Sequence, residues 1–238
     1  MKPGIALLLL LTATAARADR RSFIRAYEYA TQPQGNLELE LWNDIDAPNQ
    51  GGFAAASTLH RVELEYGLTD HWDLSLYHVF ATDSPDRAFR FDSWRAETRY
   101  RFAEKGEWPV DLLVYFELER PADFAAPWET EEKIILARDI GPIGLVANLV
   151  AEQKLLHAGD GHLWEIDLGA RYEFSPQLRL AGEFWTVQES AAGVSKTSYF
   201  LGPSLSVAAS KIWVQLGVGF GLGQSDTAQV RSVIGFNL

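Results

Sequence analysis

The sequence predicts an all-β protein, a transmembrane antiparallel up-and-down β-barrel of about twelve strands. Three observations support this prediction. Apolar and polar residues alternate at period two along most of the chain after residue 35, which is typical of strands whose two faces meet different solvents. Short turns alternate with longer polar loops, as at the two rims of an outer-membrane barrel. The chain also ends in a segment, VRSVIGFNL, that keeps the same alternation to its last residue.

The first 18 residues are expected to be a secretory signal peptide. Lys2 provides a basic start, residues 5–11 form an apolar run, and Ala16-Arg17-Ala18 is a small-residue cleavage pattern. A buried N-terminal helix is the alternative, but it does not require these three features in this order. Cleavage after Ala18 changes the formal charge from −11 to −13, because it removes two of the 21 basic residues and none of the 32 acidic ones.

Residues 19–34 are expected to be a separate N-terminal segment, either periplasmic or threaded through the lumen, and residues 35–238 the barrel. Within that segment, SFIRAYEYAT (22–31) has enough aromatic and β-branched character to form an extra strand. An extra strand would make the strand count odd. We leave both alternatives open here.

Composition excludes several classes of protein. The chain has no cysteine, so it has neither disulfides nor thiolate sites. The best candidate for a membrane helix, residues 143–151, contains Asn148 and is far shorter than the roughly 18 residues required. The acidic balance without a basic cluster argues against nucleic acid as a partner. No phosphate-binding loop is present, and we expect no cofactor and no metal.

The first six strands are expected from alternation in the N-terminal half. In WRAETRYRF (94–102), one face carries Trp, Ala, Thr, Tyr and Phe, whereas the other carries three Arg and one Glu. Comparable alternation predicts strands within 36–41, 62–66, 72–76, 94–102 and 110–119, and the less regular segment 130–140 completes the set.

The C-terminal half predicts six more strands. In WEIDLGARYEF (164–174), an apolar face alternates with a face of Glu, Asp, Gly, Arg and Glu. The six segments are 145–152, 164–174, 178–184, 198–207, 212–222 and 230–238. Twelve is an even number, so both ends of the barrel are expected at the periplasmic rim.

The connections divide into two sets. Tight turns are expected at 67–70, 103–109, 141–144, 175–177 and 209–211, and longer polar loops at 45–56, 82–90, 121–129, 155–161, 188–196 and 223–227. Tryptophans are expected in two interfacial girdles, with Trp42, Trp94, Trp128 and Trp164 near the loops and Trp72, Trp108 and Trp213 near the turns. A soluble β-sandwich or lipocalin-like barrel is the alternative, but it would expose the carboxylate-rich face.

The charged face is expected to line the lumen, with fourteen acidic and eight basic residues by strand parity. The candidate lining residues are Glu63, Glu65, Glu97, Arg99, Arg101, Glu117, Glu165, Asp167, Arg171 and Glu183. Two interpretations stay open. In a narrow barrel, paired charges fill the interior and form a plug. Alternatively, the excess of carboxylates lines a narrow water-filled path that favours cations.

Two histidines suggest a minor site on the outer wall. If the turn at 67–71 is centred on Thr69, His60 and His78 lie opposite each other and point outward near the loops. Such a pair could serve a lipid-modifying enzyme, although two residues in the interfacial belt are the simpler explanation. Outer-membrane phospholipases place Ser, Asn and Gly just after their catalytic His, and neither TLHRVEL nor LYHVFAT does so. We therefore expect no catalytic residues.

Two short segments carry a family resemblance. The end of VRSVIGFNL resembles the C-terminal signal recognised by the bacterial barrel-assembly machinery, although its last residue is Leu238 and the aromatic Phe236 precedes it by two positions. The segment YEYATQPQGNLELELW is similar to one in uncharacterised, porin- or transporter-like proteobacterial outer-membrane β-barrel proteins. The resemblance implies a Gram-negative outer-membrane location, contact with its lipid, and passive transport of small solutes.

Function is therefore expected in one of three forms. The first is a narrow passive channel or facilitator for small solutes. The second is a plugged, non-conducting barrel with a structural or surface-interaction role. The third is a lipid-modifying enzyme that uses the outer wall near the two histidines.

Overall fold

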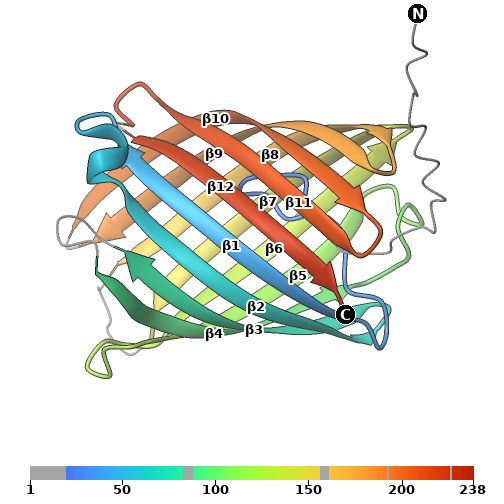
Figure 1. The fold of residues 1–238 in the computed structure, drawn as a ribbon, viewed down its shortest axis with the longest axis horizontal. Helices are drawn as coiled ribbons and strands as arrows, with labels where there is room; N and C mark the ends of the chain where they lie inside the picture. The colour runs from blue at the N-terminus through green and yellow to red at the C-terminus, as the bar shows by residue number, and fades with distance from the viewer. Residues whose placement is uncertain (1–19, 83–87, 156–160, 192, 226) are drawn as a thin grey trace, which may run out of the picture.

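The structure is a computed structural model that describes residues 20–82, 88–155, 161–191, 193–225 and 227–238. The predicted signal peptide lies outside the described residues. Twelve antiparallel strands form one closed barrel in which each strand pairs with its neighbours in sequence and β1 pairs with β12 (Figure 1). Closure pairs the edge strands with each other, so the predicted all-β, twelve-stranded barrel is confirmed.

The strands are eleven to sixteen residues long. In chain order they are β1 (Leu37–Pro48), β2 (Ser57–Thr69), β3 (Trp72–Thr82), β4 (Phe89–Arg101), β5 (Asp111–Pro121), β6 (Glu129–Ile140), β7 (Ile143–Lys154), β8 (His162–Ser175), β9 (Leu178–Ala191), β10 (Val194–Ala209), β11 (Ile212–Leu222) and β12 (Thr227–Asn237). A short 3₁₀ helix, η1 (Gly52–Ala55), lies in the β1–β2 loop.

The two rims differ in their connections as predicted, with three corrections. The tight turn expected at 103–109 is wrong, because nine residues separate β4 from β5, and the longer loop expected at 223–227 is wrong, because only four residues separate β11 from β12. Turns such as 141–142 and 210–211 form one rim, and loops such as 122–128 lie at the other. The expected long loop at 188–196 is also wrong. Strand β9 continues to Ala191, β10 begins at Val194, and these two end residues pair with each other. Ser190 and Ser195 face each other in this extension of the ladder, and their hydroxyl groups hydrogen-bond over 2.8 Å.

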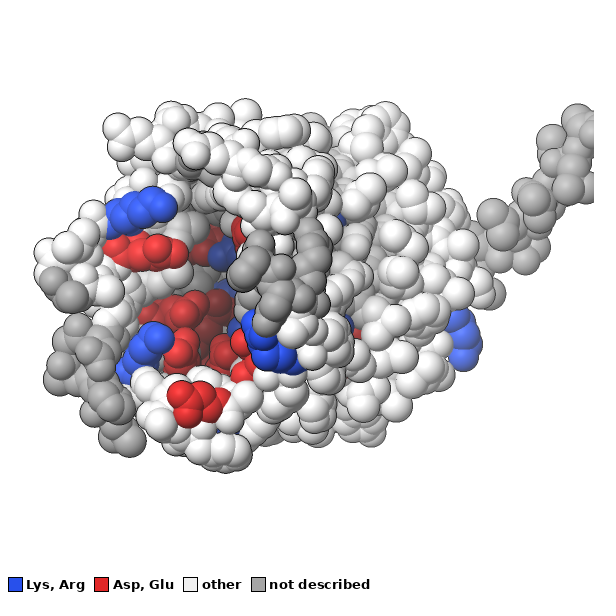
Figure 2. All heavy atoms as spheres, turned by 60° about the vertical axis from the view of Figure 1, so that its left-hand side comes forward, with Lys and Arg blue, Asp and Glu red and all other residues white. Residues whose placement is uncertain are grey.

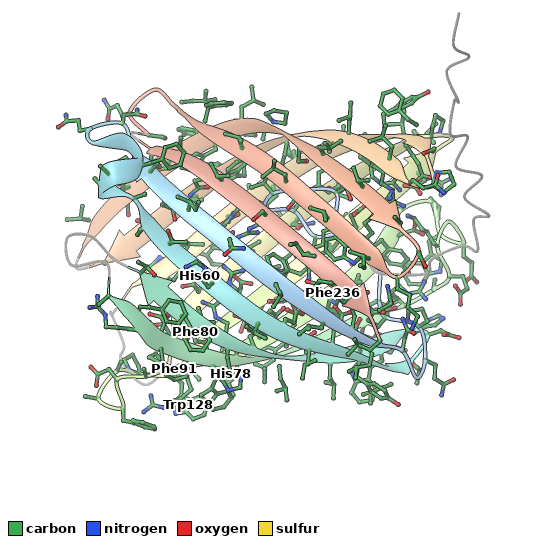
Figure 3. The ribbon with its side chains drawn as sticks, in the orientation of Figure 1. His60, His78, Phe80, Phe91, Trp128 and Phe236 are labelled. Atoms are coloured by element: carbon green, nitrogen blue, oxygen red, sulfur yellow. The ribbon has the colours of Figure 1, made fainter. Side chains whose placement is uncertain are left out.

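The outer surface of the barrel is apolar along every strand. Alternate residues such as Leu76, Leu168 and Leu216 are about half exposed, whereas their sequence neighbours are buried inside the barrel. On β12, Ile234 and Phe236 lie on this outer face and Val233 lies inside (Figure 3). No helix among the described residues is long and apolar enough to cross a membrane.

Two tryptophans correct the expected girdles. Trp42 and Trp213 are 2% and 1% exposed and point into the lumen, where their indole N–H groups donate to Glu63 and Glu38. Both tryptophans alternate in phase with the charged or polar residues of their strands, so their side chains point inward even though the residues are near a rim. Trp72 and Trp164 are exposed on the outer wall.

Residues 20–34, which we call the lumen segment, lie inside the barrel without joining the sheet. At the turn rim, Arg20 donates to the carbonyl of Pro176 and Thr31 donates to that of Asp70. Between these ends the chain folds into a hairpin-like loop whose apex, around Ile24 and Tyr27, reaches the middle of the lumen (Figure 1). None of its residues forms a strand.

The lumen segment supplies an apolar core to an otherwise charged interior. Phe23, Tyr27 and Tyr29 pack with Leu113 and Ile135, which are inward-facing residues of β5 and β6. Tyr27 and Tyr115 meet edge to face with ring centroids 5.1 Å apart. Apolar packing of this kind contributes about 25 cal/mol per Å² of buried surface. The segment is thus held by side-chain contacts and not by a backbone ladder.

Candidate functional site

The ten candidate lumen residues project from the inner face of five strands. Glu63 and Glu65 come from β2; Glu97, Arg99 and Arg101 from β4; Glu117 from β5; Glu165, Asp167 and Arg171 from β8; and Glu183 from β9. Nine of them are buried, and Arg101 at the turn rim is partly exposed. The structure therefore brings all ten inside the barrel, at different depths.

A hollow opens from the loop rim toward the middle of the barrel, and acidic side chains line its interior (Figure 2). We call it the loop-side hollow. Its empty volume, which includes space open to solvent at the mouth, is about 470 Å³. Of the ten candidates, only Glu117, Glu165 and Asp167 line it, and its other lining residues are Arg25, Tyr27, Arg61, Tyr77, Arg95, Tyr115, Glu131, Lys133, Val150 and Arg231. The apex of the lumen segment forms its floor through Arg25 and Tyr27.

The deepest charge cluster lies below this floor, toward the turn rim. The guanidinium of Arg99 contacts Glu65, lies 2.7 Å from Asp73 Oδ2 and lies 3.4 Å from Glu97 Oε1. All four side chains are at most 2% exposed. Three carboxylates around one guanidinium are acceptable in a buried site only while that cation is present.

Two inner carboxylates each accept a hydrogen bond from a neutral donor. Glu63 accepts a hydrogen bond of 2.9 Å from the Trp42 indole, and Glu97 accepts one from the Tyr77 hydroxyl. Because such donors carry no charge, the lumen keeps an excess of carboxylates. Among the fourteen acids and eight bases that strand parity assigns to the inner face, the excess is six, and the lumen segment reduces it to four because it adds Arg20, Arg21, Arg25 and Glu28.

Glu183 anchors the apex of the lumen segment. Its carboxylate accepts backbone N–H groups from Ile24 (2.7 Å), Arg25 (2.9 Å) and Ala26. Hydrogen bonds to a charged acceptor contribute about 1.5–3 kcal/mol each. Beside it, Asn148 pairs with both backbone groups of Tyr27, at 2.6 and 3.1 Å.

Two further candidates hold the segment closer to the turn rim. Arg171 forms an ion pair of 2.9 Å with Glu28, and Arg101 donates to the Thr31 hydroxyl over 2.8 Å. In the adjoining β4–β5 turn, the exposed carboxylate of Glu104 accepts a hydrogen bond of 2.8 Å from His71. This hydrogen bond lowers the pKa of Glu104, and the positive charge of the nearby Arg101 lowers it further. Arg101, Arg171 and Glu183 therefore contact the segment instead of lining the loop-side hollow.

We expect Glu183→Ala to loosen the apex, because three backbone donors lose their acceptor. Amide hydrogen exchange at Ile24, Arg25 and Ala26 should accelerate by roughly tenfold or more, which corresponds to about 1.4 kcal/mol. Glu132→Ala is the control. Glu132 lies two residues before the exposed Ile134 on β6, so its side chain is on the outer face of the barrel and not in the lumen. Unchanged exchange in Glu183→Ala would contradict the anchoring role.

Sequence reasoning missed several residues of this site. Tyr77, Tyr115 and Lys133 line the hollow, and the Lys133 ammonium lies 3.9 and 4.4 Å from the ring centroids of Tyr27 and Tyr115. Parity alone places them inside, but without a charge pattern they do not stand out. Asn148 had a readable signal, because it is the one strongly polar residue in the apolar run 143–151.

The predicted opposition of His60 and His78 is wrong. His60 pairs with Phe80 and His78 with Val62. The β2–β3 turn lies at residues 70–71 instead of being centred on Thr69, and a bulge between Gly67 and Thr69 shifts the register by one residue, so the pairing differs from the predicted one by two. Both histidines lie on the loop-side half of the wall, near Phe80 and Phe91 (Figure 3).

His60 and His78 are thus diagonal neighbours on the outer face, each beside an aromatic ring. His60 Nδ1 lies 2.7 Å from Asn43 Oδ1, and no serine or threonine hydroxyl of the described residues hydrogen-bonds to either ring. Their ring centroids lie 5.6 and 6.2 Å from those of Phe89 and Phe91, respectively. Within the described part of the chain, no group of three or more His, Cys, Asp or Glu is arranged to hold a metal ion.

The fold resembles that of known outer-membrane proteins, although the sequence does not. No protein-family model and no curated protein matches the sequence. Among solved structures, the NanC porin is similar with a TM-score of 0.62 and 9% identity, over 84% of this chain and 100% of that chain. The KdgM porin has a TM-score of 0.59 and 9% identity, over 84% of this chain and 99% of that one.

A third similar structure is the COG4313 outer membrane channel from Pseudomonas putida F1, with a TM-score of 0.59 and 14% identity over 91% of this chain and 100% of that one. The chain shares its fold with porins and an outer-membrane channel. At these identities the similarity concerns the fold alone.

Proposed function

We propose that the chain is a narrow passive channel of the bacterial outer membrane for small solutes, cation-favouring and closed at rest by the lumen segment. The observation that carries the proposal is the loop-side hollow, a charged cavity inside a barrel whose outer surface is apolar (Figure 2). A polar interior behind an apolar wall is the arrangement of a membrane barrel that contains water.

The outer surface supports the membrane location. A closed ladder satisfies the backbone hydrogen bonds of the strands, as a chain in hydrocarbon requires. Exposed Leu76, Leu168 and Leu216 would contact lipid tails, whereas Trp72 and Trp164, toward opposite rims, would lie at headgroup depth. The fold shared with porins agrees with this location.

The charge of the whole inner face, where carboxylates outnumber bases, supports a preference for cations. The lining of the hollow itself is close to neutral, with five bases and four acids. Lys133 is paired with Glu131 at 2.7 Å and Arg95 with Glu117 at 3.0 Å, so these bases are already neutralised. Arg25 is paired with Glu165, and Arg61 and Arg231 share Asp44, so the one base left over is offset by Asp167. A negative potential in a narrow, low-dielectric passage concentrates cations.

The test is the zero-current potential across a planar bilayer in a KCl gradient, measured with the full chain and with a variant that lacks residues 20–34. We expect discrete cation-selective currents, with a selectivity that falls in Asp167→Asn but not in Glu132→Gln, which removes one charge from the outer face. Anion selectivity, or folded barrels that stay silent in both forms, would contradict the proposal and favour a non-conducting barrel.

A further inference from the structure

The floor of the loop-side hollow presents a guanidinium that belongs to the lumen segment. Arg25 Nε donates to Glu165 Oε1 over 2.8 Å, and its Nη2 donates to Oε2. The side chain of Arg25 is 29% exposed, whereas that of Glu165 is 3% exposed. This is a bidentate guanidinium–carboxylate pair with the carboxylate beneath and the guanidinium facing the hollow.

A second carboxylate lies beside this pair and has an unused acceptor. Asp167 follows Glu165 by two residues on β8, so both side chains lie on the same face and both line the hollow. Asp167 is 1% exposed, and its Oδ1 has no hydrogen-bond partner among the residues that the structure describes. A buried carboxylate oxygen without a donor is costly, which points to a donor that arrives from the hollow.

The walls around these carboxylates already accept cations on aromatic faces. Lys133 lies over the rings of Tyr27 and Tyr115, and both rings line the same hollow. Guanidinium groups are planar, weakly hydrated and suited both to bidentate carboxylates and to stacking on aromatic rings. The two rings already hold the ammonium of Lys133, whereas the bidentate pair of Arg25 with Glu165 is the geometry that matches a guanidinium better than a compact ammonium.

From this arrangement we infer that Glu165 and Asp167 form a binding site for small solutes that carry a guanidinium group, and that Arg25 occupies it as a tethered competitor. The inference rests on the proposed channel function and names its solute class. A solute that enters from the loop rim displaces the Arg25 guanidinium from Glu165. Because the next donors in the segment bind Glu183, displacement of Arg25 also weakens the apex that closes the lumen.

Competition with a tethered group sets the affinity that we expect. A group on a short flexible tether has an effective concentration of the order of millimolar. The parent protein should therefore bind a free guanidinium only in the millimolar range. Arg25→Gln removes the competitor while leaving both carboxylates in place, so it should bind the same probe roughly tenfold more tightly or better.

The experiment is a calorimetric titration of the folded full chain in detergent with methylguanidinium. Urea is the neutral planar control and methylammonium the compact cation. We expect weak binding to the parent, tighter binding to Arg25→Gln, and loss of binding when Glu165→Gln or Asp167→Asn is added to that variant. Glu132→Gln should bind like its parent. Heat-modifiable gel migration verifies that each barrel is folded, and Asp167→Asn keeps the test decisive if Glu165→Gln does not fold.

Binding and conduction separate the two proposals. If Arg25→Gln binds no more tightly than the parent, or if urea or methylammonium binds as well as methylguanidinium, the inference is wrong, even when the barrel conducts. If the expected binding pattern occurs in a barrel that passes no current with or without residues 20–34, the guanidinium site stands and the channel is wrong.

Discussion

Replacing two wall glycines by leucine, in a Gly169→Leu/Gly217→Leu variant, should expel the lumen segment and open the barrel. A Cβ on Gly169 would lie 2.6 Å from a ring carbon of Phe23, and one on Gly217 would lie 2.3 Å from Ile24 Cγ1. The two glycines thus leave the space that Phe23 and Ile24 occupy at the start of the apex. Overpacking costs about 1–3 kcal/mol at each site, so the two clashes should shift the balance toward release by roughly 30-fold or more.

Two measurements check this expectation. Limited proteolysis should cleave the released segment while leaving the barrel intact, and liposomes that contain the variant should swell faster in a small solute such as methylguanidinium chloride. Gly182→Leu is the matched control, because Gly182 is exposed and a Cβ there meets nothing within 4 Å. Protection of residues 20–34 in the double variant, with parental swelling, would show that these contacts do not hold the segment.

The second large effect is expected at the Arg99 cluster. Arg99→Leu leaves Glu65, Asp73 and Glu97 buried without their shared cation. Breaking a buried ion pair by removing one partner costs about 3–5 kcal/mol. We expect a lower free energy of unfolding, seen as loss of the compact, heat-modifiable gel band at a lower urea concentration.

Arg138→Leu is the control for this experiment. Its guanidinium donates to the backbone carbonyl of Trp108 in an exposed position, and hydrogen bonds of that kind contribute little net stability. Urea midpoints that are equal in Arg99→Leu and the parent would mean that water reaches the cluster and that the carboxylates are not truly buried.

Alternation in the sequence was sufficient to predict the barrel and its inner face. Period-two patterning assigns each residue of a strand to one face, so Glu165, Asp167 and Glu183 could be placed inside without any knowledge of pairing. The prediction of the tryptophan girdles was wrong where it did not follow this alternation. Trp42 and Trp213 were assigned to girdles because of their residue type, although their positions in the alternation place them in the lumen.

Register could not be predicted from the same pattern. The relation between His60 and His78 depends on a turn at residues 70–71 and on a bulge between Gly67 and Thr69, and both change strand partners without changing the alternation in the rest of each strand. A turn centred on Thr69 was a reasonable hypothesis that local sequence alone could not test.

The position of the lumen segment depends on contacts that are distant in sequence. Its apex is anchored by Glu183 and Asn148, more than 120 residues away, so no local pattern specifies it. One signal was nevertheless present. Glycines at inward positions of strands, such as Gly169 and Gly217, weaken a strand unless something packs closely against them.

The central claim is that the charged lumen is a path for solutes and that residues 20–34 close it. Its most direct test is single-channel conductance of the full chain and of the variant without residues 20–34, refolded in the same detergent and recorded in the same bilayer. We expect the full chain to be closed for most of the recording and the shortened barrel to show steady discrete steps. A shortened barrel that is folded by gel migration but remains silent would contradict the claim.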